Sequence, residues 1–363
     1  MTKSQKKTNP TKLKKFVSEI FLFYGFSKTH ALLCAEVLVE ADLRGIDSHG
    51  IARLEGYVRL IENKRINPNP NFSWVKNKGA VATLNADSAI GLVSAPFAMK
   101  EAIKKAKKYG CGFVSIQNSN HFGIAGYHAE LASKNELIGL AMTNASPLVS
   151  PPGTNKRMLG TNPIAIAIPN PHFSKYPFLL DMATSAAANG KLEIAQREGK
   201  QIPKGWISMD GEDSTDPFAL KEGASLLPLG SDLEHGSHKG FGLSAFVDIF
   251  TGVLSGANFG PWVPPFVAFL DPLPNLPGKG LGHFVGAWNP DFFGDKNDFF
   301  NQMKIWSNEF SNAPKSSEQG VIIPGQPEFT QREKRLVEGI FLNDIIYESL
   351  VSLAQKTNLK FNI

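Results

Sequence analysis

Apolar positions in the first part of the chain repeat at helical spacing. Phe16, Ile20 and Phe23 lie three or four residues apart, which predicts one face of an amphipathic helix. A second apolar series over residues 32–41 follows Ser27, and serine is a favoured residue at the cap that begins a helix. The N-terminal region is therefore predicted to be helical.

A third helix is predicted over residues 48–63, with Ser48 as its cap. Beside its apolar face, His49, Arg53 and Tyr57 recur every four residues and form a second stripe. The N-terminus of a helix favours an anion, and a guanidinium can hold a carboxylate through two parallel hydrogen bonds. The stripe is a candidate carboxylate site, while a solvated helix face or a polar domain interface would give the same pattern.

From about residue 72 the pattern changes to short apolar runs, which are typical of strands. Between them, residues 94–108 and 124–133 show helical spacing, and residues 331–355 predict one or two closing helices that could return to the N-terminal layer. This mixture predicts an α/β or α+β fold. The predicted strands cover residues 79–84, 112–116, 138–143 and 164–168.

A run rich in proline and asparagine, residues 67–71, marks a domain boundary. The chain of 363 residues is long enough for two or three domains. We expect a helical domain of residues 1–71 that is joined by residues 310–363. Residues 72–309 would form a second domain that contains the sheet.

Residues 249–270 carry no charge, yet they include three prolines and three glycines. Because these residues break helices, the segment is predicted to be buried and rich in turns instead of crossing a membrane. Cys34 and Cys111 are too few for a disulfide framework, and no apolar run of the kind found in secretory signals follows the N-terminus. We expect a soluble, cytoplasmic protein that contacts no membrane.

The formal net charge of +5 comes from a short segment. The first seventeen residues contain six lysines and no acidic residue, so the rest of the chain is nearly neutral. This distribution predicts a solvated, disordered tail, with a weak contact to a polyanion or a membrane as the alternative. We expect no nucleic-acid partner.

A histidine lies in a loop where catalytic side chains are common. His121 follows the predicted strand 112–116 and precedes the predicted helix 124–133. Histidine suits general acid–base chemistry because its ordinary pKa lies near operating pH. A purely structural loop histidine is the alternative, and His128, seven residues later, is expected at most to support it.

Small residues at strand ends allow a backbone to approach a bulky ligand closely, although tight turns would give the same pattern. Such residues lie in the segments 159–163 and 180–185. Lys239, beside glycines at the start of a predicted helix, suits a phosphate. The Gly-x-Gly-x-x-Ala match at 240–245 follows a polar loop and has no acid about 20 residues later, which excludes a Rossmann site. His235 and His238 offer only a weak metal site, so no metal is expected.

Together these motifs resemble the type 2 malate/L-lactate dehydrogenase family. That family also includes L-sulfolactate and ureidoglycolate dehydrogenases, a diketogulonate reductase and a cyclic-imine reductase. The motifs follow the family's order over most of the chain: Arg44–Gly50, Ser119–Gly123, Gly160–Pro163, Asp181–Ser185, Pro203–Trp206, Thr215–Pro217, Leu227–Gly230, Lys239–Leu243 and Leu254–Ala257.

The resemblance implies a non-Rossmann nicotinamide-binding domain with a large, mainly antiparallel sheet, and a helical domain built from both termini. In that case residues 72–309 would bind NAD or NADP, with NAD slightly preferred, and the protein would be a homodimer. His172 and Lys175 lie in a loop where they could meet the 2′-phosphate of NADP, or could simply be solvated.

The resemblance also assigns roles to residues. His121 matches the catalytic histidine of the family. Gln326 replaces an acid often found in the family's C-terminal Pro-Gly-Glu segment, so a cofactor contact at that position is not expected. The substrate-binding residues would be Ser48, His49, Arg53 and Tyr57. The cofactor-binding residues would be Ser146, Gly160, Thr161, Asn162, Asp181, Met182, Ala183 and Lys239.

The function implied is reversible hydride transfer between NAD(P)H and a small 2-oxo acid, giving an L-2-hydroxy acid of the malate, lactate or sulfolactate type. In this hypothesis Arg53, helped by Ser48 and His49, holds the carboxylate, and His121 exchanges a proton with the substrate oxygen. The alternatives are reduction of a cyclic imine or a diketo sugar acid, a non-catalytic scaffold that keeps the fold, and a metal-dependent hydrolase.

Overall fold

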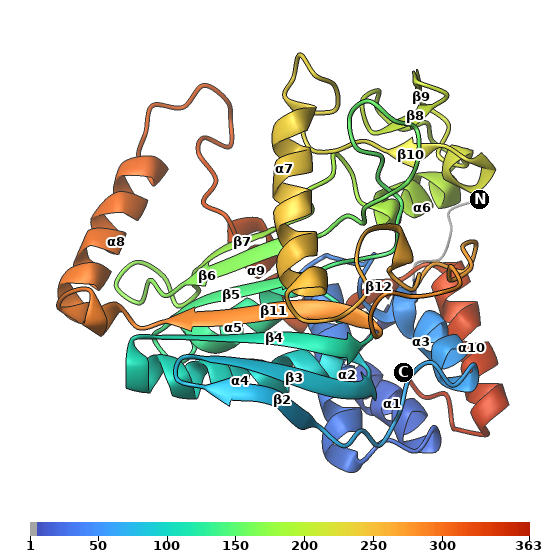
Figure 1. Cartoon of the computed structure of the whole chain (residues 1–363), viewed down its shortest axis with the longest axis horizontal. Helices are drawn as coiled ribbons and strands as arrows, with labels where there is room; N and C mark the ends of the chain where they lie inside the picture. Colours follow the sequence, from blue (N-terminus) through green and yellow to red (C-terminus); the bar gives the residue numbers. More distant parts are fainter. Residues whose placement is uncertain (1–5) are drawn as a thin grey trace.

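The structure, a computed structural model, describes residues 6–363 and is built around a seven-stranded sheet (Figure 1). The strand order is β2-β3-β4-β11-β5-β6-β7, and among these pairs only β3 and β4 run parallel. This confirms the prediction of a mainly antiparallel, non-Rossmann sheet. The strands are β2 (Ser73–Lys78), β3 (Val81–Ala89), β4 (Cys111–Ser119), β5 (Ile138–Thr143), β6 (Ile164–Ile168), β7 (Phe178–Met182) and β11 (Leu281–Trp288).

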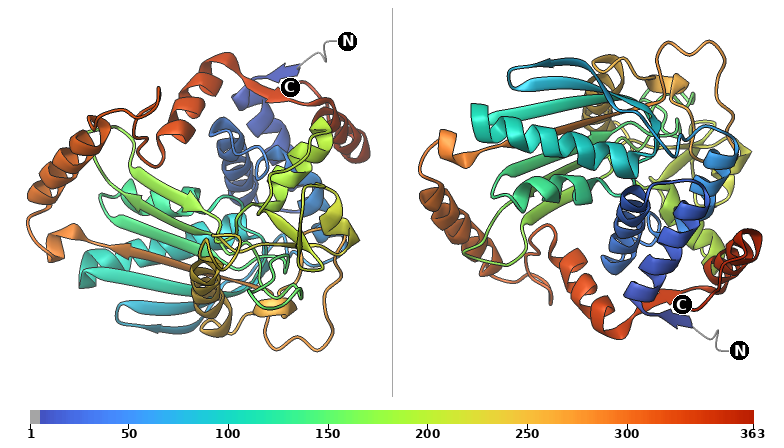
Figure 2. Two further views of the ribbon diagram at one scale, coloured as in Figure 1. Left: turned by 90° about the horizontal axis from the view of Figure 1, so that it is seen from above. Right: turned by 90° about the horizontal axis from the view of Figure 1, so that it is seen from below.

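Two helices, α4 (Gly91–Tyr109) and α5 (Ala125–Ser133), lie on one face of this sheet (Figure 2). Glycines in the strands allow this close approach. A Cβ atom on Gly112 would lie 2.1 Å from the carbonyl oxygen of Ala102 in α4. A Cβ atom on Gly139 would lie 2.0 Å from that of Ala129 in α5. The loop that carries His121 connects β4 to α5, so this packing fixes both of its ends.

The two ends of the chain form one helical layer. One hydrophobic core contains buried residues of α1 (Pro10–Phe23), α2 (Lys28–Leu43), α3 (Leu54–Glu62) and α10 (Asp344–Thr357). The strand β1 (Lys6–Thr8) pairs with β12 (Ile340–Leu342). Ser27 caps α2 as predicted, since its hydroxyl accepts a hydrogen bond from the His30 N–H at 3.2 Å. A helical unit made from both termini is thus confirmed, while the boundaries given above stay predictions.

The prediction of a disordered basic tail is wrong within the described residues. Lys6 and Lys7 belong to β1, and α1 begins at Pro10, with Asn9 as its cap. Lys14 forms a 2.9 Å ion pair with Glu36 of α2. These lysines therefore contribute to a folded layer, and Lys3 lies outside the described residues.

A third, smaller core lies beside the sheet and was not predicted from the sequence. It joins α6 (Asn189–Glu198) to a three-stranded sheet of β8 (Ile207–Met209), β9 (Glu212–Ser214) and β10 (Ser225–Leu226). Leu192 of α6 is fully buried in it. Because α6 packs into this core, it is held separately from the helical layer that contains α3.

Other helices leave apolar side chains in solvent. The helix α7 (Ser237–Asp248) carries Lys239 near its start, and α8 (Lys296–Ser311) projects from the body (Figure 1). The helix α9 (Gln326–Glu338) precedes β12. The segment 249–270 is rich in turns as predicted, but its expected burial is only partly right, because Ile249 is 52% exposed. Within residues 6–363, no helix is long and apolar enough to cross a membrane.

Candidate active site

His121 lies in the loop between β4 and α5, among aromatic residues from distant segments. Its Nδ1 lies 2.6 Å from the Tyr57 hydroxyl oxygen. Its ring centroid is 4.5 Å from that of Phe266 and 5.8 Å from that of His49. The stripe seen on the third helix and the loop histidine therefore belong to one cluster, although they are far apart in sequence.

The start of the third helix differs from the prediction. Ser48 lies in a turn and does not cap the helix, because a 3-10 turn, Ile51–Arg53, comes before α3. The Ile51 N–H donates to the buried carboxylate of Asp42 at 2.8 Å instead. The Ser48 hydroxyl contacts His49 Nδ1 at 2.9 Å, and its carbonyl accepts from Arg53 Nε at 2.5 Å. Ser48 thus orients the two side chains that flank His121.

A small chamber of about 60 Å³ lies between His49, Arg53 and His121. Its walls come from the end of β5, the start of β6, the start of α6 and the long segment before β11. They are mostly small or apolar, which suits a flat ring next to a few polar groups. The other lining residues are Ala145, Ser146, Leu148, Thr161, Ala188, Asn189, Gly190, Phe266, Val267 and Leu281.

Burial keeps the imidazoles in this cluster neutral. It lowers the pKa of His121 well below 6.5, and electrostatic interaction with the neighbouring His49 and Arg53 adds to that effect. Burial, followed by the charge of Arg53, lowers the pKa of His49 to about 3. His121 is therefore neutral near pH 7 and ready to accept a proton. When it is protonated both ring nitrogens carry hydrogen, so Nδ1–H then donates to the Tyr57 oxygen.

Arg53 presents its guanidinium to a carboxylate of the protein itself. Its two terminal nitrogens donate to Glu193 of α6 at 3.2 and 2.9 Å. Asn189, at the start of the same helix, donates to Glu193 at 2.8 Å. The Arg53 side chain is 14% exposed, so it is well placed to hold an anion beside His121.

The proposed cofactor residues are distributed over two regions. Ser146 and Thr161 line the chamber. The Ser146 hydroxyl accepts from the Phe266 N–H at 2.9 Å, which fixes Phe266 against His121. Lys239 is exposed in the first turn of α7 and does not line the chamber.

Several of these residues also hold the backbone in place. Asn162 is fully buried, accepts from the Ala145 N–H at 3.2 Å and donates to the Ser244 carbonyl of α7 at 3.1 Å. Asp181 accepts from the Gly126 N–H, at the start of α5, at 2.7 Å. Burial raises the pKa of Asp181 to about 6. A contact between the cofactor and Asp181 therefore stays a prediction, as it does for Gly160, Met182 and Ala183, which do not line the chamber.

Comparison with known proteins identifies the family. Residues 8–351 match the family model for malate/L-lactate dehydrogenase. The chain is 40% identical over 348 residues to malate dehydrogenase of Pyrococcus abyssi, covering 95% of this chain and 93% of that protein. The chain belongs to this family. It is also 38% identical over 353 residues to the malate/(S)-sulfolactate dehydrogenase of Methanothermus fervidus, covering 97% and 98% of the two chains.

A solved structure supports the same family. The crystal structure of malate dehydrogenase from Entamoeba histolytica superposes with a TM-score of 0.91 at 34% identity, covering 99% of this chain and 100% of that one. Dehydrogenases of this malate/L-lactate dehydrogenase family use a nicotinamide cofactor. The protein is therefore an oxidoreductase that acts on hydroxy acids, as its motifs implied.

Two contributors to this candidate site were not identified from the sequence. Phe266 lies in the uncharged segment 249–270, where the sequence showed only prolines and glycines as local signals. Glu193 lies in α6, a helix that was not predicted. Neither has a local motif, since each reaches the site through tertiary packing. His128, in contrast, is fully buried and its Nε2 contacts the Phe122 carbonyl at 2.7 Å, so it supports the loop that carries His121.

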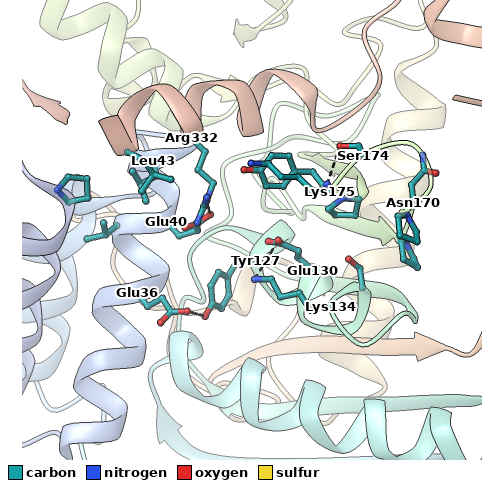
Figure 3. A pocket seen from close by; sticks show the side chains of 18 of the residues that line it. Glu36, Glu40, Leu43, Tyr127, Glu130, Lys134, Asn170, Ser174, Lys175 and Arg332 are labelled. Atoms are coloured by element: carbon teal, nitrogen blue, oxygen red, sulfur yellow. Dashed lines mark hydrogen bonds and ion pairs between the residues drawn. The ribbon is translucent and has the colours of Figure 1, made fainter. Parts of the chain in front are cut away.

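A separate cavity of about 640 Å³ lies between α2, α5 and α9. Figure 3 shows Tyr127 reaching toward Glu36, and Arg332 toward Glu40. The basic residues that line it are all paired with carboxylates of the protein: Lys14, Lys134, Lys175 and Arg332. Among residues 6–363, no group of three or more histidine, cysteine, aspartate or glutamate side chains is placed to hold a metal ion.

Proposed function

We propose that the protein catalyses reversible hydride transfer between NADH and a small 2-oxo acid, giving an L-2-hydroxy acid of the malate, lactate or sulfolactate type. The observation that carries this proposal is that one chamber is lined by both His121 and Arg53. A proton donor and an anion-binding fork are the two groups that a 2-oxo acid needs at adjacent positions.

In this proposal Arg53 binds the substrate carboxylate, and Ser48 and His49 keep the guanidinium in place. The Ser48 carbonyl accepts from Arg53 Nε, which leaves the two terminal nitrogens for the carboxylate. Neutral His49 adds a hydrogen bond without adding charge. Holding the acid end in this way fixes the distance between the neighbouring carbon and His121.

His121 would exchange the proton in both directions. During oxidation the neutral ring, in the tautomer whose Nδ1–H donates to Tyr57, accepts the hydroxyl proton of the substrate on Nε2. During reduction the protonated ring returns that proton to the oxygen. Binding of a substrate carboxylate beside the ring adds negative charge, which favours the protonated form needed for reduction.

The residues of the chamber fit a nicotinamide. Ser146 and Thr161 offer hydroxyl groups for its carboxamide, and Leu148, Val267 and Leu281 offer apolar walls for its ring. The bound nicotinamide would supply or accept the hydride. We assign Ser146 and Thr161 to cofactor binding, and propose that Lys239 contacts a phosphate.

We propose NAD over NADP as the cofactor. His172 and Lys175 were the residues considered for a 2′-phosphate. His172 contacts Asn301 at 3.0 Å, and Lys175 pairs with Glu333 at 3.0 Å. Because both have partners within the chain, neither offers a free cation for the extra phosphate.

A cofactor-oxidation assay tests the proposal. We expect NADH oxidation with at least one acid from a panel of pyruvate, oxaloacetate and sulfopyruvate, and slower oxidation of NADPH. Absorbance at the wavelength of the reduced nicotinamide follows the reaction. Turnover of a cyclic imine or a diketo sugar acid instead of these acids would support the other reductases of the family. No turnover with any of these compounds would contradict the proposal.

We also propose that the protein forms a homodimer in the cytoplasm. Phe293 is 79% exposed and Ile305 of the projecting α8 is 61% exposed, and clusters of exposed apolar side chains mark interfaces. Cys34 and Cys111 are both unpaired, in keeping with a reducing compartment. Sedimentation is expected to give about twice the chain mass of 39.5 kDa, and the double variant Phe293→Glu, Ile305→Glu to give the single mass. A monomeric parent protein would contradict the dimer.

A further inference from the structure

The guanidinium of Arg53 is already held by a carboxylate in this structure. Glu193 accepts from both terminal nitrogens, the geometry with which arginine holds a substrate acid. One guanidinium edge cannot offer the same pair of donors to two carboxylates at once. A substrate acid that uses this edge must therefore displace Glu193.

The two partners of this ion pair belong to different cores. Arg53 ends the 3-10 turn before α3, in the helical layer, whereas Glu193 belongs to α6 and the small third core. At the same contact, a Cβ atom on Gly190 would lie 2.3 Å from that of Ser48, so the backbone of α6 lies directly against the Ser48 turn. Only glycine permits this approach. The helix α6 thus closes the chamber on this side.

The volumes of two neighbouring cavities are those expected if α6 closes the chamber beside His121. The chamber beside His121 measures about 60 Å³, far below the roughly 300–1,000 Å³ of pockets that hold small ligands. A cavity of about 660 Å³ adjoins it, and Arg53, Asn189, Phe266 and Val267 line both. Glu193 lines the larger one. The ion pair therefore lies where the outer cavity meets the chamber.

We propose that Glu193 is a built-in competitor for Arg53 and that α6 is a lid which this ion pair keeps closed until a carboxylate arrives. The inference rests on the proposed function in that the incoming ligand is the carboxylate of a 2-oxo acid. The acid takes the place of Glu193 on Arg53, and the released α6 moves to enlarge the chamber. The outer cavity carries Arg59 and Arg197 along the way, and these cations attract an anion.

The expected gain in ligand affinity follows from the fraction of molecules in which the lid is closed. A ligand that binds only the open state binds more weakly in proportion to the fraction of molecules that are open. If Glu193 holds the lid for nine-tenths of the time, removing it strengthens apparent binding about tenfold. Glu193→Gln keeps the size of the side chain and removes its charge.

The test compares Glu193→Gln with the parent protein, both loaded with NADH, using oxamate as the probe. We expect the variant to bind oxamate about 3- to 10-fold more tightly by calorimetry, with a lower KM for the 2-oxo acid. Hydrogen–deuterium exchange of the amides of residues 189–198 should be faster in the variant. Equal or weaker oxamate binding, or unchanged exchange, would overturn the proposal and make Glu193 a residue that orients Arg53.

A matched variant separates this effect from a general loss of charge. Glu198 lies on the same helix and pairs with Lys200 at 2.7 Å, outside the chamber. Glu198→Gln should leave oxamate binding, KM and exchange unchanged. The exchange experiment needs no turnover, so the lid is tested even if the substrate panel shows no reaction. A negative panel with faster exchange in Glu193→Gln would reject the proposed reaction and retain the lid.

Discussion

His121→Asn is expected to lower kcat by about 10²–10⁴-fold in both directions while leaving NADH binding unchanged, because a positioned proton donor or acceptor contributes about that much. Asparagine fills similar space, yet its amide cannot accept and return a proton near neutral pH. Initial rates measure the first effect, and fluorescence titration with NADH measures the second. Turnover close to that of the parent protein would remove His121 from the reaction.

The control for this variant is a histidine away from the chamber. His235 is exposed and contacts Asp232 at 2.7 Å, so His235→Asn should keep the parent rate. The pH profile gives a second check. Oxidation needs neutral His121, and burial holds its pKa well below 6.5. The acid-side fall of kcat/KM should therefore lie below pH 6.5 in the parent protein and be absent from the Asn variant.

Four of the seven strands of the sheet were predicted from the sequence, because they are short apolar runs between clear turns, whereas the central β11 was not. The predicted strands 138–143 and 164–168 coincide with β5 and β6. In contrast, the prediction that Ser48 caps the third helix was wrong. The sequence does not show that the buried Asp42 carboxylate accepts the hydrogen bond from the Ile51 N–H, at the start of the 3-10 turn.

The site was predicted only as far as local patterns extend. The four-residue spacing of His49, Arg53 and Tyr57 brought a cation, an imidazole and a phenol to one face, and the structure adds His121 to them. What closes the chamber could not be predicted in this way. Glu193 is one of many charged residues on a polar helix, and its meaning depends on how two separate cores meet.

Arg53→Met is expected to lower kcat/KM for the 2-oxo acid by about 10²–10⁴-fold. Each charge-assisted hydrogen bond to a carboxylate contributes about 1.5–3 kcal/mol, and the variant loses two of them together with the orientation that they impose. Arg53→Lys should fall in between, because lysine keeps the charge but lacks the planar fork. Steady-state kinetics with the preferred acid measure the loss. A neutral 2-oxo amide should be affected far less, and an equal loss for both substrates would contradict a carboxylate contact.

Combining the two variants tests whether Glu193 acts through Arg53. If its only role is to compete for the guanidinium, Glu193→Gln should improve substrate affinity in the parent protein and have no effect in Arg53→Met. The coupling between the two changes would then account for the whole effect of the glutamate variant, as a double-mutant cycle measures it. If Glu193→Gln changed affinity equally in both backgrounds, Glu193 would act on the substrate by a route that does not involve Arg53.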